Sequence, residues 1–197
     1  MPRRARTRPD EPGRDKMLAA GRDVFAERGY HAASVASIGE RAEIAKSVLY
    51  HHFGSKAQLY EAVLAAETKD LIERVEAAVT DVAKDDRLRA GMDAYLEHLE
   101  RHPDAWRLLL HDRPADVEAA AIYDRLQAER AAMLAPLLSS PPEPGAPGKD
   151  DHVGLVIAGI RAFCGWWYEH RDVPRERILD AILSFNAISA HERLSAE

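Results

Sequence analysis

One seven-residue stretch, residues 46–52, concentrates the polar and aromatic chemistry of this chain. Its sequence, Lys-Ser-Val-Leu-Tyr-His-His, supplies an ammonium, a hydroxyl, a phenol and two imidazoles. A helix of this composition is too polar for a core and too aromatic for an ordinary solvated face. The major groove of DNA admits one helix and favours donors that reach phosphates and base edges. The stretch therefore predicts a recognition helix for double-stranded DNA.

The candidate DNA contacts differ in what each side chain offers. Lys46, in the first helical turn, can reach a phosphate or a guanine edge, whereas Val48 can only touch a thymine methyl group. The amide groups that follow Ser34 begin a helix, and such amides can hold a phosphate oxygen. The full candidate set is Ser34, Lys46, Ser47, Val48, Tyr50, His51 and Lys56. The alternative for residues 50–53 is a partly buried aromatic cluster, to which we assign Phe53 and His52.

The elements that position these residues read as three short helical segments. Ser34 is a good N-cap for a helix over residues 35–42, and Ser55 is a good N-cap for a long helix that follows. Leu49 and Phe53 lie four residues apart, so both face inward and hold the recognition helix on a core. A turn of three or four residues joins the first two helices, which makes a helix-turn-helix.

The rest of the chain also has helical periodicity, and it shows no strand pattern. A first helix begins near Arg14 and ends near Gly29. We predict an all-α protein of about nine helices, with a helix-turn-helix head and a helical body. The later helices are predicted over residues 88–101, 104–110, 114–138, 151–170 and 175–193.

Proline and charge patterns divide the chain into three parts. Residues 1–12 carry Arg3, Arg4, Arg6 and Arg8 among prolines and read as a disordered basic arm. It is either a solvated tail or a minor-groove contact. Residues 13–60 form the predicted DNA-binding domain, and residues 61–197 form the predicted ligand-binding and dimerisation domain. Within the body, the Pro- and Gly-rich residues 139–149 predict a mobile loop.

Composition is consistent with a cytoplasmic DNA-binding protein. The net charge is −6, yet residues 1–60 hold 11 Lys and Arg against 7 Asp and Glu, while residues 61–197 hold 16 against 26. A basic head on an acidic body orients a protein on a polyanion, although such a split also occurs in proteins without that function. We found no apolar run long enough for a membrane span and no signal segment. The single cysteine, Cys164, fits a reducing cytoplasm.

At this point a family resemblance is clear. Residues 14–64 resemble the DNA-binding head of the TetR family of transcriptional regulators, through residues 25–30, Ser34, Ile38, Ala42, Lys46, Leu49, Tyr50, His52, Phe53, Ser55, Lys56 and Leu59. The resemblance implies an all-helical homodimer whose variable body binds a small effector. The family usually has glycine at the positions of Glu43 and Ser47, a hydroxyl residue at Ala45 and threonine at Val48.

The sequence of the body does not identify a ligand. Aromatic residues on helical stripes are suited to an apolar effector pocket, or alternatively to the core or a dimer interface. Trp166 and Trp167 are adjacent and must face different ways. The candidate effector contacts are Tyr95, Leu99, Trp106, Leu110, Tyr123, Phe163, Trp166 and Trp167. The two strong stripes at the end of the chain, about 151–170 and 175–193, predict a homodimer through a four-helix bundle.

Catalytic and metal motifs are not evident. His98 and His102 have the i, i+4 spacing of metal ligands but no clear third ligand, and no nucleophile elbow or phosphate loop is present. We therefore expect no metal, no cofactor and no enzyme activity. The leading hypothesis is a repressor that binds a palindromic operator and is released by a small molecule. The alternatives are a helical metal-binding protein or enzyme, and a regulator without a small-molecule effector.

Overall fold

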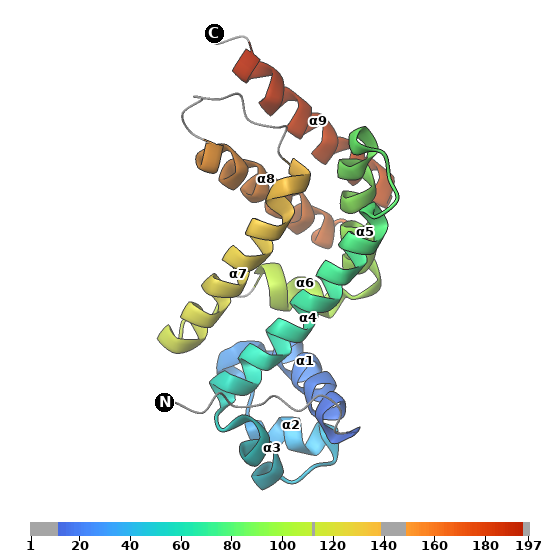
Figure 1. Ribbon diagram of the computed structural model, residues 1–197. Helices are drawn as coiled ribbons and strands as arrows, with labels where there is room; N and C mark the ends of the chain where they lie inside the picture. Colours follow the sequence, from blue (N-terminus) through green and yellow to red (C-terminus); the bar gives the residue numbers. More distant parts are fainter. Residues whose placement is uncertain (1–11, 112, 139–148, 195–197) are drawn as a thin grey trace, which may run out of the picture.

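The computed structural model describes residues 12–111, 113–138 and 149–194, and these residues are helical nearly throughout (Figure 1). The all-α prediction is therefore confirmed. The elements in chain order are α1 (Pro12–Ala32), α2 (Val35–Ala42), α3 (Lys46–Phe53), α4 (Lys56–Val79), η1 (Lys84–Asp86), α5 (Arg87–Arg101), α6 (Pro103–Trp106), η2 (Arg107–His111), α7 (Val117–Leu138), α8 (Lys149–Glu169) and α9 (Arg175–Leu194). The predicted arm and most of the predicted loop, residues 139–148, lie outside the described residues.

The short helices of the head begin where their capping residues predict. Ser34 has an extended backbone, and its hydroxyl accepts the amide of Ser37 at 3.0 Å. The Ser37 hydroxyl in turn accepts the amide of Ser34 at 3.2 Å, which closes a reciprocal capping box. Ser55 caps α4 in the same way through the amide of Gln58. Each cap satisfies an amide that the helix itself leaves free.

The turn between α2 and α3 is tight and carries one strained residue. Glu43 has φ 54° and ψ 40°, a left-handed conformation that favours glycine. A Cβ on Gly39 would lie 2.7 Å from the carbonyl oxygen of Ile44, so the chain can fold back only over a glycine. Ile44 then donates its amide to the Gly39 carbonyl at 2.8 Å. The turn thus depends on Gly39 for space and accepts strain at Glu43.

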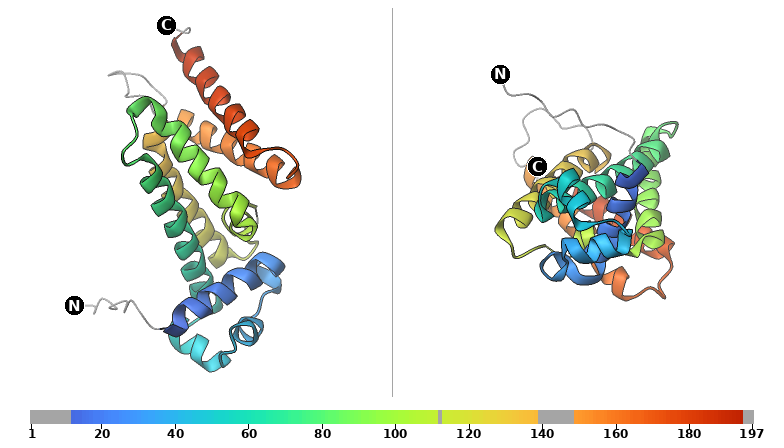
Figure 2. Two further views of the ribbon diagram at one scale, coloured as in Figure 1. Left: turned by 90° about the vertical axis from the view of Figure 1, so that its right-hand side faces the viewer. Right: turned by 90° about the horizontal axis from the view of Figure 1, so that it is seen from below.

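The long helix α4 joins the head to the body. It begins against α1 and α3 and then packs along α5 and α7, and Figure 2 shows it running from the head up one side of the body. Its buried side includes Tyr60, Leu64, Leu71 and Val75. The boundary that we predicted between residues 60 and 61 falls inside this continuous helix.

The body contains one departure from the predicted helices. The predicted helix over residues 104–110 is divided into the single turn α6 and the π-helical segment η2. Pro103 occupies the first turn of α6, where its missing amide costs nothing. The elements α6 and η2 lie against α1, so they form the contact between body and head together with α4. Among the described residues, no helix is long and apolar enough to cross a membrane.

Candidate nucleic-acid interface

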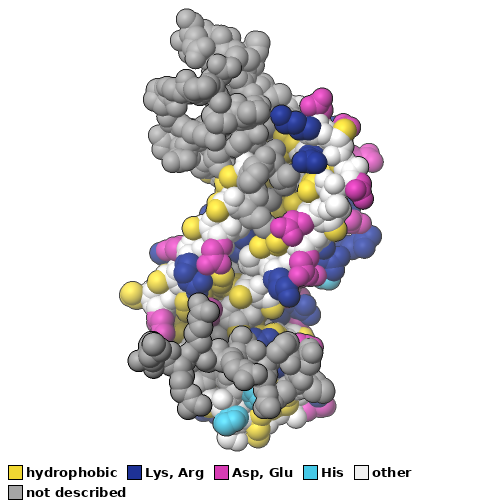
Figure 3. All heavy atoms as spheres, viewed as in Figure 1, with side chains coloured by type: hydrophobic (Ala, Val, Ile, Leu, Met, Phe, Trp, Pro, Cys, Tyr) yellow, Lys and Arg dark blue, Asp and Glu magenta, His cyan; other side chains and the backbone are white. Residues whose placement is uncertain are grey.

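The helix α3 buries one face and exposes the other. Leu49 is 1% exposed and Phe53 9% exposed, so both anchor the helix on the head as predicted. Val48 is 39% exposed and Tyr50 42% exposed, which is unusual for side chains of this size. Figure 3 shows histidine and hydrophobic side chains meeting at the tip of the head, while most acidic side chains in that view lie over the body. The tip of the head in this view therefore carries histidine and hydrophobic side chains.

The outward face of α3 brings most of the predicted DNA contacts together. Lys46, Ser47 and His51 are all exposed, and the Lys46 ammonium lies 5.5 Å from the centre of the Tyr50 ring. That cation–π contact directs the lysine along the exposed side of the helix. His52 is also exposed, contrary to our assignment of it to a partly buried cluster. Its ring lies 5.8 Å from that of His51, so both imidazoles belong to the outer surface of the helix.

Lys56 lies at the edge of this surface and already has partners in the head. Its ammonium donates to the carbonyl oxygen of His31 at 3.2 Å and lies 4.4 Å from the centre of the Tyr30 ring. Burial lowers the pKa of Lys56, while the nearby carboxylate of Asp116 acts in the opposite direction. The side chain thus ties the end of α1 to the start of α4. Ser34 is also exposed, but its hydroxyl is engaged in the capping box.

The head that carries α3 is held by aromatic and ionic contacts. The ring of Phe25 lies 5.1 Å from that of Tyr60, and Tyr30 lies 4.9 Å from Tyr60. Arg41, in the last turn of α2, makes two hydrogen bonds to Glu27 of α1, at 2.9 and 2.8 Å. This pair lowers the pKa of Glu27. The recognition helix is therefore mounted on a three-helix core that fixes its direction.

Comparison with known proteins agrees with this geometry. The family model described as "Bacterial regulatory proteins, tetR family" matches residues 17–63. The transcriptional activator FasR of Mycolicibacterium smegmatis is 30% identical over 203 residues, which cover 93% of this chain and 85% of that protein. The chain belongs to the TetR family. It is accordingly a DNA-binding transcriptional regulator and not an enzyme.

Two further similarities concern a shorter part of the sequence and the fold. The transcriptional repressor KstR2 of Mycolicibacterium smegmatis is 43% identical over 58 residues, covering 28% of each chain. The crystal structure of the regulator FadR from Bacillus subtilis in complex with stearoyl-CoA has a TM-score of 0.74 and 16% identity. That alignment covers 89% of this chain and 96% of the other, so the TetR fold extends over the body.

The structure distributes the predicted effector contacts over three environments. Tyr95 and Leu110 line a small internal cavity of about 20 Å³ between α5, α7 and α8, and Tyr123 lies beside it. Phe163 and Trp166 instead line an open groove between α8 and α9. The remaining three, Leu99, Trp106 and Trp167, are packed in the core at 1–3% exposure. Trp167 is fixed there because its indole donates to the carbonyl of Val173 at 2.8 Å.

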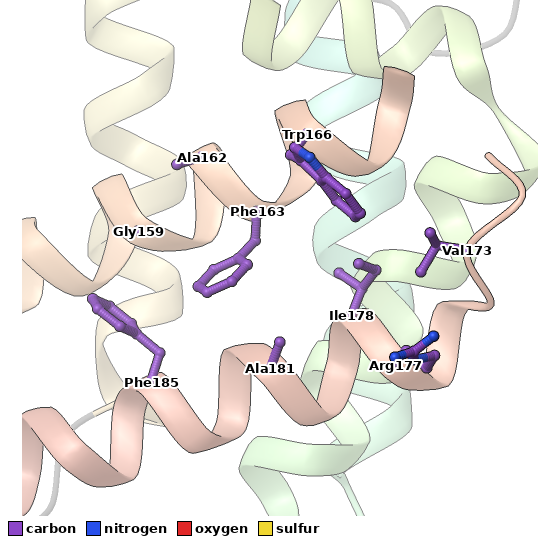
Figure 4. A pocket seen from close by; sticks show the side chains of 9 residues that line it. All are labelled: Gly159, Ala162, Phe163, Trp166, Val173, Arg177, Ile178, Ala181 and Phe185. Atoms are coloured by element: carbon purple, nitrogen blue, oxygen red, sulfur yellow. The ribbon is translucent and has the colours of Figure 1, made fainter. Parts of the chain in front are cut away.

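A second hollow is the groove between α8 and α9. Its volume is about 670 Å³, and Figure 4 shows aromatic side chains from both helices facing it. Its lining consists of Gly159, Ala162, Phe163, Trp166, Val173, Arg177, Ile178, Ala181 and Phe185. Trp166 is 48% exposed, which places a large apolar side chain in water on this isolated chain. Such a patch marks an interaction surface.

A buried polar cluster in the body was not predicted from the sequence. Arg130 is only 4% exposed, and its guanidinium donates to the Thr68 hydroxyl at 3.1 Å and to the carbonyl oxygen of Leu109 in η2. Gln127 donates to that same carbonyl at 2.6 Å. The available signal was periodicity, since Arg130 continues the buried stripe of Tyr123 and Leu126 on α7 at helical spacing. A charged residue on an apolar stripe calls for a buried partner or a ligand.

The histidine pair does not form a recognisable metal site among the described residues. No group of three His, Cys, Asp or Glu side chains within them converges as metal ligands. His98 is buried, neither ring nitrogen has a hydrogen bond, and Nδ1 lies 3.6 Å from Asp70 Oδ2. Burial lowers the pKa of His98 to about 4, and His102 acts in the same direction. His98 is consequently a neutral residue at pH 7.

Proposed function

We propose that this protein is a ligand-responsive repressor that binds a palindromic operator as a homodimer and leaves it when a small effector binds the body. The exposed outer face of α3, mounted on the packed head of residues 13–60, is the observation that carries the proposal. In this proposal α3 enters the major groove. The DNA contacts are then Ser34, Lys46, Ser47, Val48, Tyr50, His51 and Lys56, with Lys56 serving also as a brace within the head.

The groove between α8 and α9 supports the homodimer. A second copy that lays its own α8 and α9 against the groove would remove Trp166 and Phe163 from water and complete a four-helix bundle. Two heads joined in this way would reach successive major grooves, which lie about 34–36 Å apart. Two-fold symmetry of the protein then requires two-fold symmetry of the operator.

The effector acts by changing the distance or angle between the two heads. Only a ligand with different affinity for the two arrangements can shift their populations. The candidate lever is α4, together with α6 and η2, because these elements connect the body, residues 61–197, with α1 of the head. The FadR structure with stearoyl-CoA supports a ligand site in a body of this fold.

Activation is the second candidate function. It is favoured by FasR, a transcriptional activator that is similar over 93% of this chain, whereas KstR2, a repressor, matches over 28% of it. Both functions use the same DNA-binding surface. They differ in whether the operator overlaps or precedes the promoter, so a promoter–reporter strain with and without the protein separates them: repression lowers expression and activation raises it.

The first experiment measures binding to labelled DNA from upstream of the gene that encodes this protein. Fluorescence anisotropy across a salt series, with excess competitor DNA, should show saturable binding that survives competitor and weakens as salt rises. The variant Tyr50→Ala, which alters only the exposed face of α3, should weaken that binding. Specific binding that is unaffected by Tyr50→Ala would remove α3 from the interface, and absence of specific binding to any genomic fragment would refute the proposal.

A further inference from the structure

The cavity beside Arg130 carries an excess of positive charge. Arg130 and Arg161 both line it, and neither forms an ion pair with a carboxylate of the described residues. Arg161 donates to the carbonyl oxygen of Leu110 at 3.2 Å, so both guanidinium groups are held by neutral oxygens. Arg130 is 4% exposed, whereas Arg161 is exposed at the edge of the cavity. An arginine is almost never fully buried unless it is paired, because an uncompensated charge in a protein interior is costly, so it is Arg130 that requires a partner. The site therefore lacks an anion.

The remainder of the cavity lining is apolar. Leu110, Ala131, Ile157 and Ile160 complete the lining around the polar groups. Tyr95 and Gln127 add a hydroxyl and an amide on the polar side. A guanidinium matches a carboxylate through two parallel hydrogen bonds, and the fit is best where water is excluded. This combination of groups selects an amphipathic carboxylate over a neutral or cationic molecule.

The same cations hold the element that contacts the head. Leu109 and Leu110 belong to η2, and their carbonyl oxygens accept the hydrogen bonds of Arg130 and Arg161. The segment η2 also lies against α1, α4 and α8. A π-helical segment is uncommon and often accompanies a functional site. A carboxylate that takes the guanidinium groups from these carbonyls would release η2 from its position against α1.

The cavity is small, with a volume of about 20 Å³. This volume is close to what one water molecule occupies, so a carboxylate with a tail must separate the surrounding helices. Ligand binding and movement of η2 are then one event. We propose that the effector is an apolar molecule with a carboxylate head, bound by Arg130 and Arg161, and that it signals by displacing the η2 carbonyls. This inference rests on the proposed function, in which the body binds an effector.

The test compares matched ligands on the full-length protein by isothermal titration calorimetry. Decanoate, 1-decanol and decanoyl-CoA share one tail and differ in the head. We expect decanoate to bind about tenfold or more tightly than decanol, which corresponds to one charge-assisted pair. Equal binding of decanoate and decanol, tighter binding of decanoyl-CoA, or no binding of decanoate would overturn the carboxylate assignment.

Two variants on one helix locate the interaction. Arg130→Met should remove the preference for decanoate over decanol. Arg125→Met is the matched control, since Arg125 lies on α7 with an exposed side chain paired to Glu61 and Glu129, and it should keep the preference. If Arg130→Met does not fold by circular dichroism, Arg130→Lys keeps the charge but not the two-pronged geometry and should weaken decanoate several-fold. Retention of the full preference in a folded Arg130 variant would refute the assignment.

A DNA-release experiment distinguishes failure of this inference from failure of the proposed function. Wild-type protein on its operator, followed by anisotropy, should release DNA when decanoate is added and retain it with decanol. Specific DNA binding without any decanoate effect would refute the effector class and leave the DNA-binding proposal standing. Decanoate binding by calorimetry without specific DNA binding would refute the proposed function instead.

Discussion

At the scale of single residues, the chain separates side chains that hold the head together from those that face outward. Lys46 and Lys56 have the same chemistry, yet Lys46 touches only Tyr50, while Lys56 spans the His31 carbonyl and the Tyr30 ring. A substitution at Lys56 would therefore change folding and binding together. Lys46 gives the cleaner test of the interface.

The substitution Lys46→Ala should weaken binding to all DNA sequences by a similar factor. Removing one phosphate contact should also reduce the slope of log affinity against log salt concentration by about one. Anisotropy titrations at several salt concentrations measure both quantities. Lys69→Ala is the control, because Lys69 is exposed on α4 and pairs with Glu73. Equal slopes for wild type and Lys46→Ala would mean that this lysine touches no phosphate.

His98 should make the folded state sensitive to acid. Its pKa is about 4 in the fold against an ordinary 6.5, because burial disfavours the charged ring, with His102 and Arg74 adding to the shift and Asp70 opposing it. As the pH falls below 6.5, His98 becomes protonated in the unfolded chain, whereas in the folded chain it becomes protonated only near pH 4. Stability from this group is complete above pH 6.5 and is lost between 6.5 and 4. The loss is on the order of 3 kcal/mol.

Chemical denaturation at several pH values checks this prediction. His98→Leu should flatten the dependence over that interval, since the titrating group is gone from both states. His31→Gln, at an exposed histidine, should leave the dependence unchanged. A wild-type protein as stable at pH 4.5 as at pH 7 would show that His98 is protonated in the fold.

At the scale of elements, the recognition helix is less well capped than its neighbours. Both α2 and α4 begin with a serine whose hydroxyl accepts a backbone amide, whereas α3 begins at Ala45 without a side-chain cap. The backbone of Ala45 is extended, φ −62° and ψ 139°, as an N-cap residue requires. A serine at position 45 could therefore cap α3 without a change in backbone conformation.

Ala45→Ser should raise the free energy of unfolding by about 1 kcal/mol, the usual contribution of an N-cap. The gain comes from one more satisfied amide in the first turn of α3. Urea denaturation followed by circular dichroism measures it. Ala45→Val, which adds bulk without a hydrogen-bond acceptor, should not stabilise the protein. If both variants behaved alike, capping would not limit the stability of α3.

At the scale of the whole molecule, the head and the body share α4, and α8 and α9 lie toward the end of the body away from the head (Figure 1). The apolar groove lies between these two helices. In the isolated chain, Trp166 in this groove is 48% exposed to water, which is unfavourable for a large apolar side chain. In the proposed homodimer, a second copy would cover this side chain and bring two heads into one assembly. Dimer formation and operator affinity should therefore fail together.

Trp166→Glu should convert the protein to a monomer and abolish tight operator binding, while the helical content stays the same. A buried carboxylate without a partner is unfavourable in an interface, so the substitution would destabilise the proposed dimer. Sedimentation velocity gives the mass of the assembly. Val117→Glu is the control, because Val117 is 85% exposed at the start of α7. A Trp166→Glu protein that remains dimeric would place the interface elsewhere.

What the sequence alone determined is the local structure. The α2 helix at residues 35–42 and the caps at Ser34 and Ser55 were predicted as observed, because capping and periodicity are properties of neighbouring residues. The inward direction of Leu49 and the opposite directions of Trp166 and Trp167 follow from helical spacing for the same reason.

Only the tertiary structure decided which distant segments meet. The partners of Lys56 lie on α1, and those of Arg130 lie on α4 and η2, 62 and 21 residues away. Such separations leave no trace in local periodicity. The prediction that His52 is partly buried was wrong, because its place next to the buried Phe53 does not decide its exposure and packing does. The fold creates the cavity beside Arg130, and only this cavity makes the buried charge a candidate ligand contact.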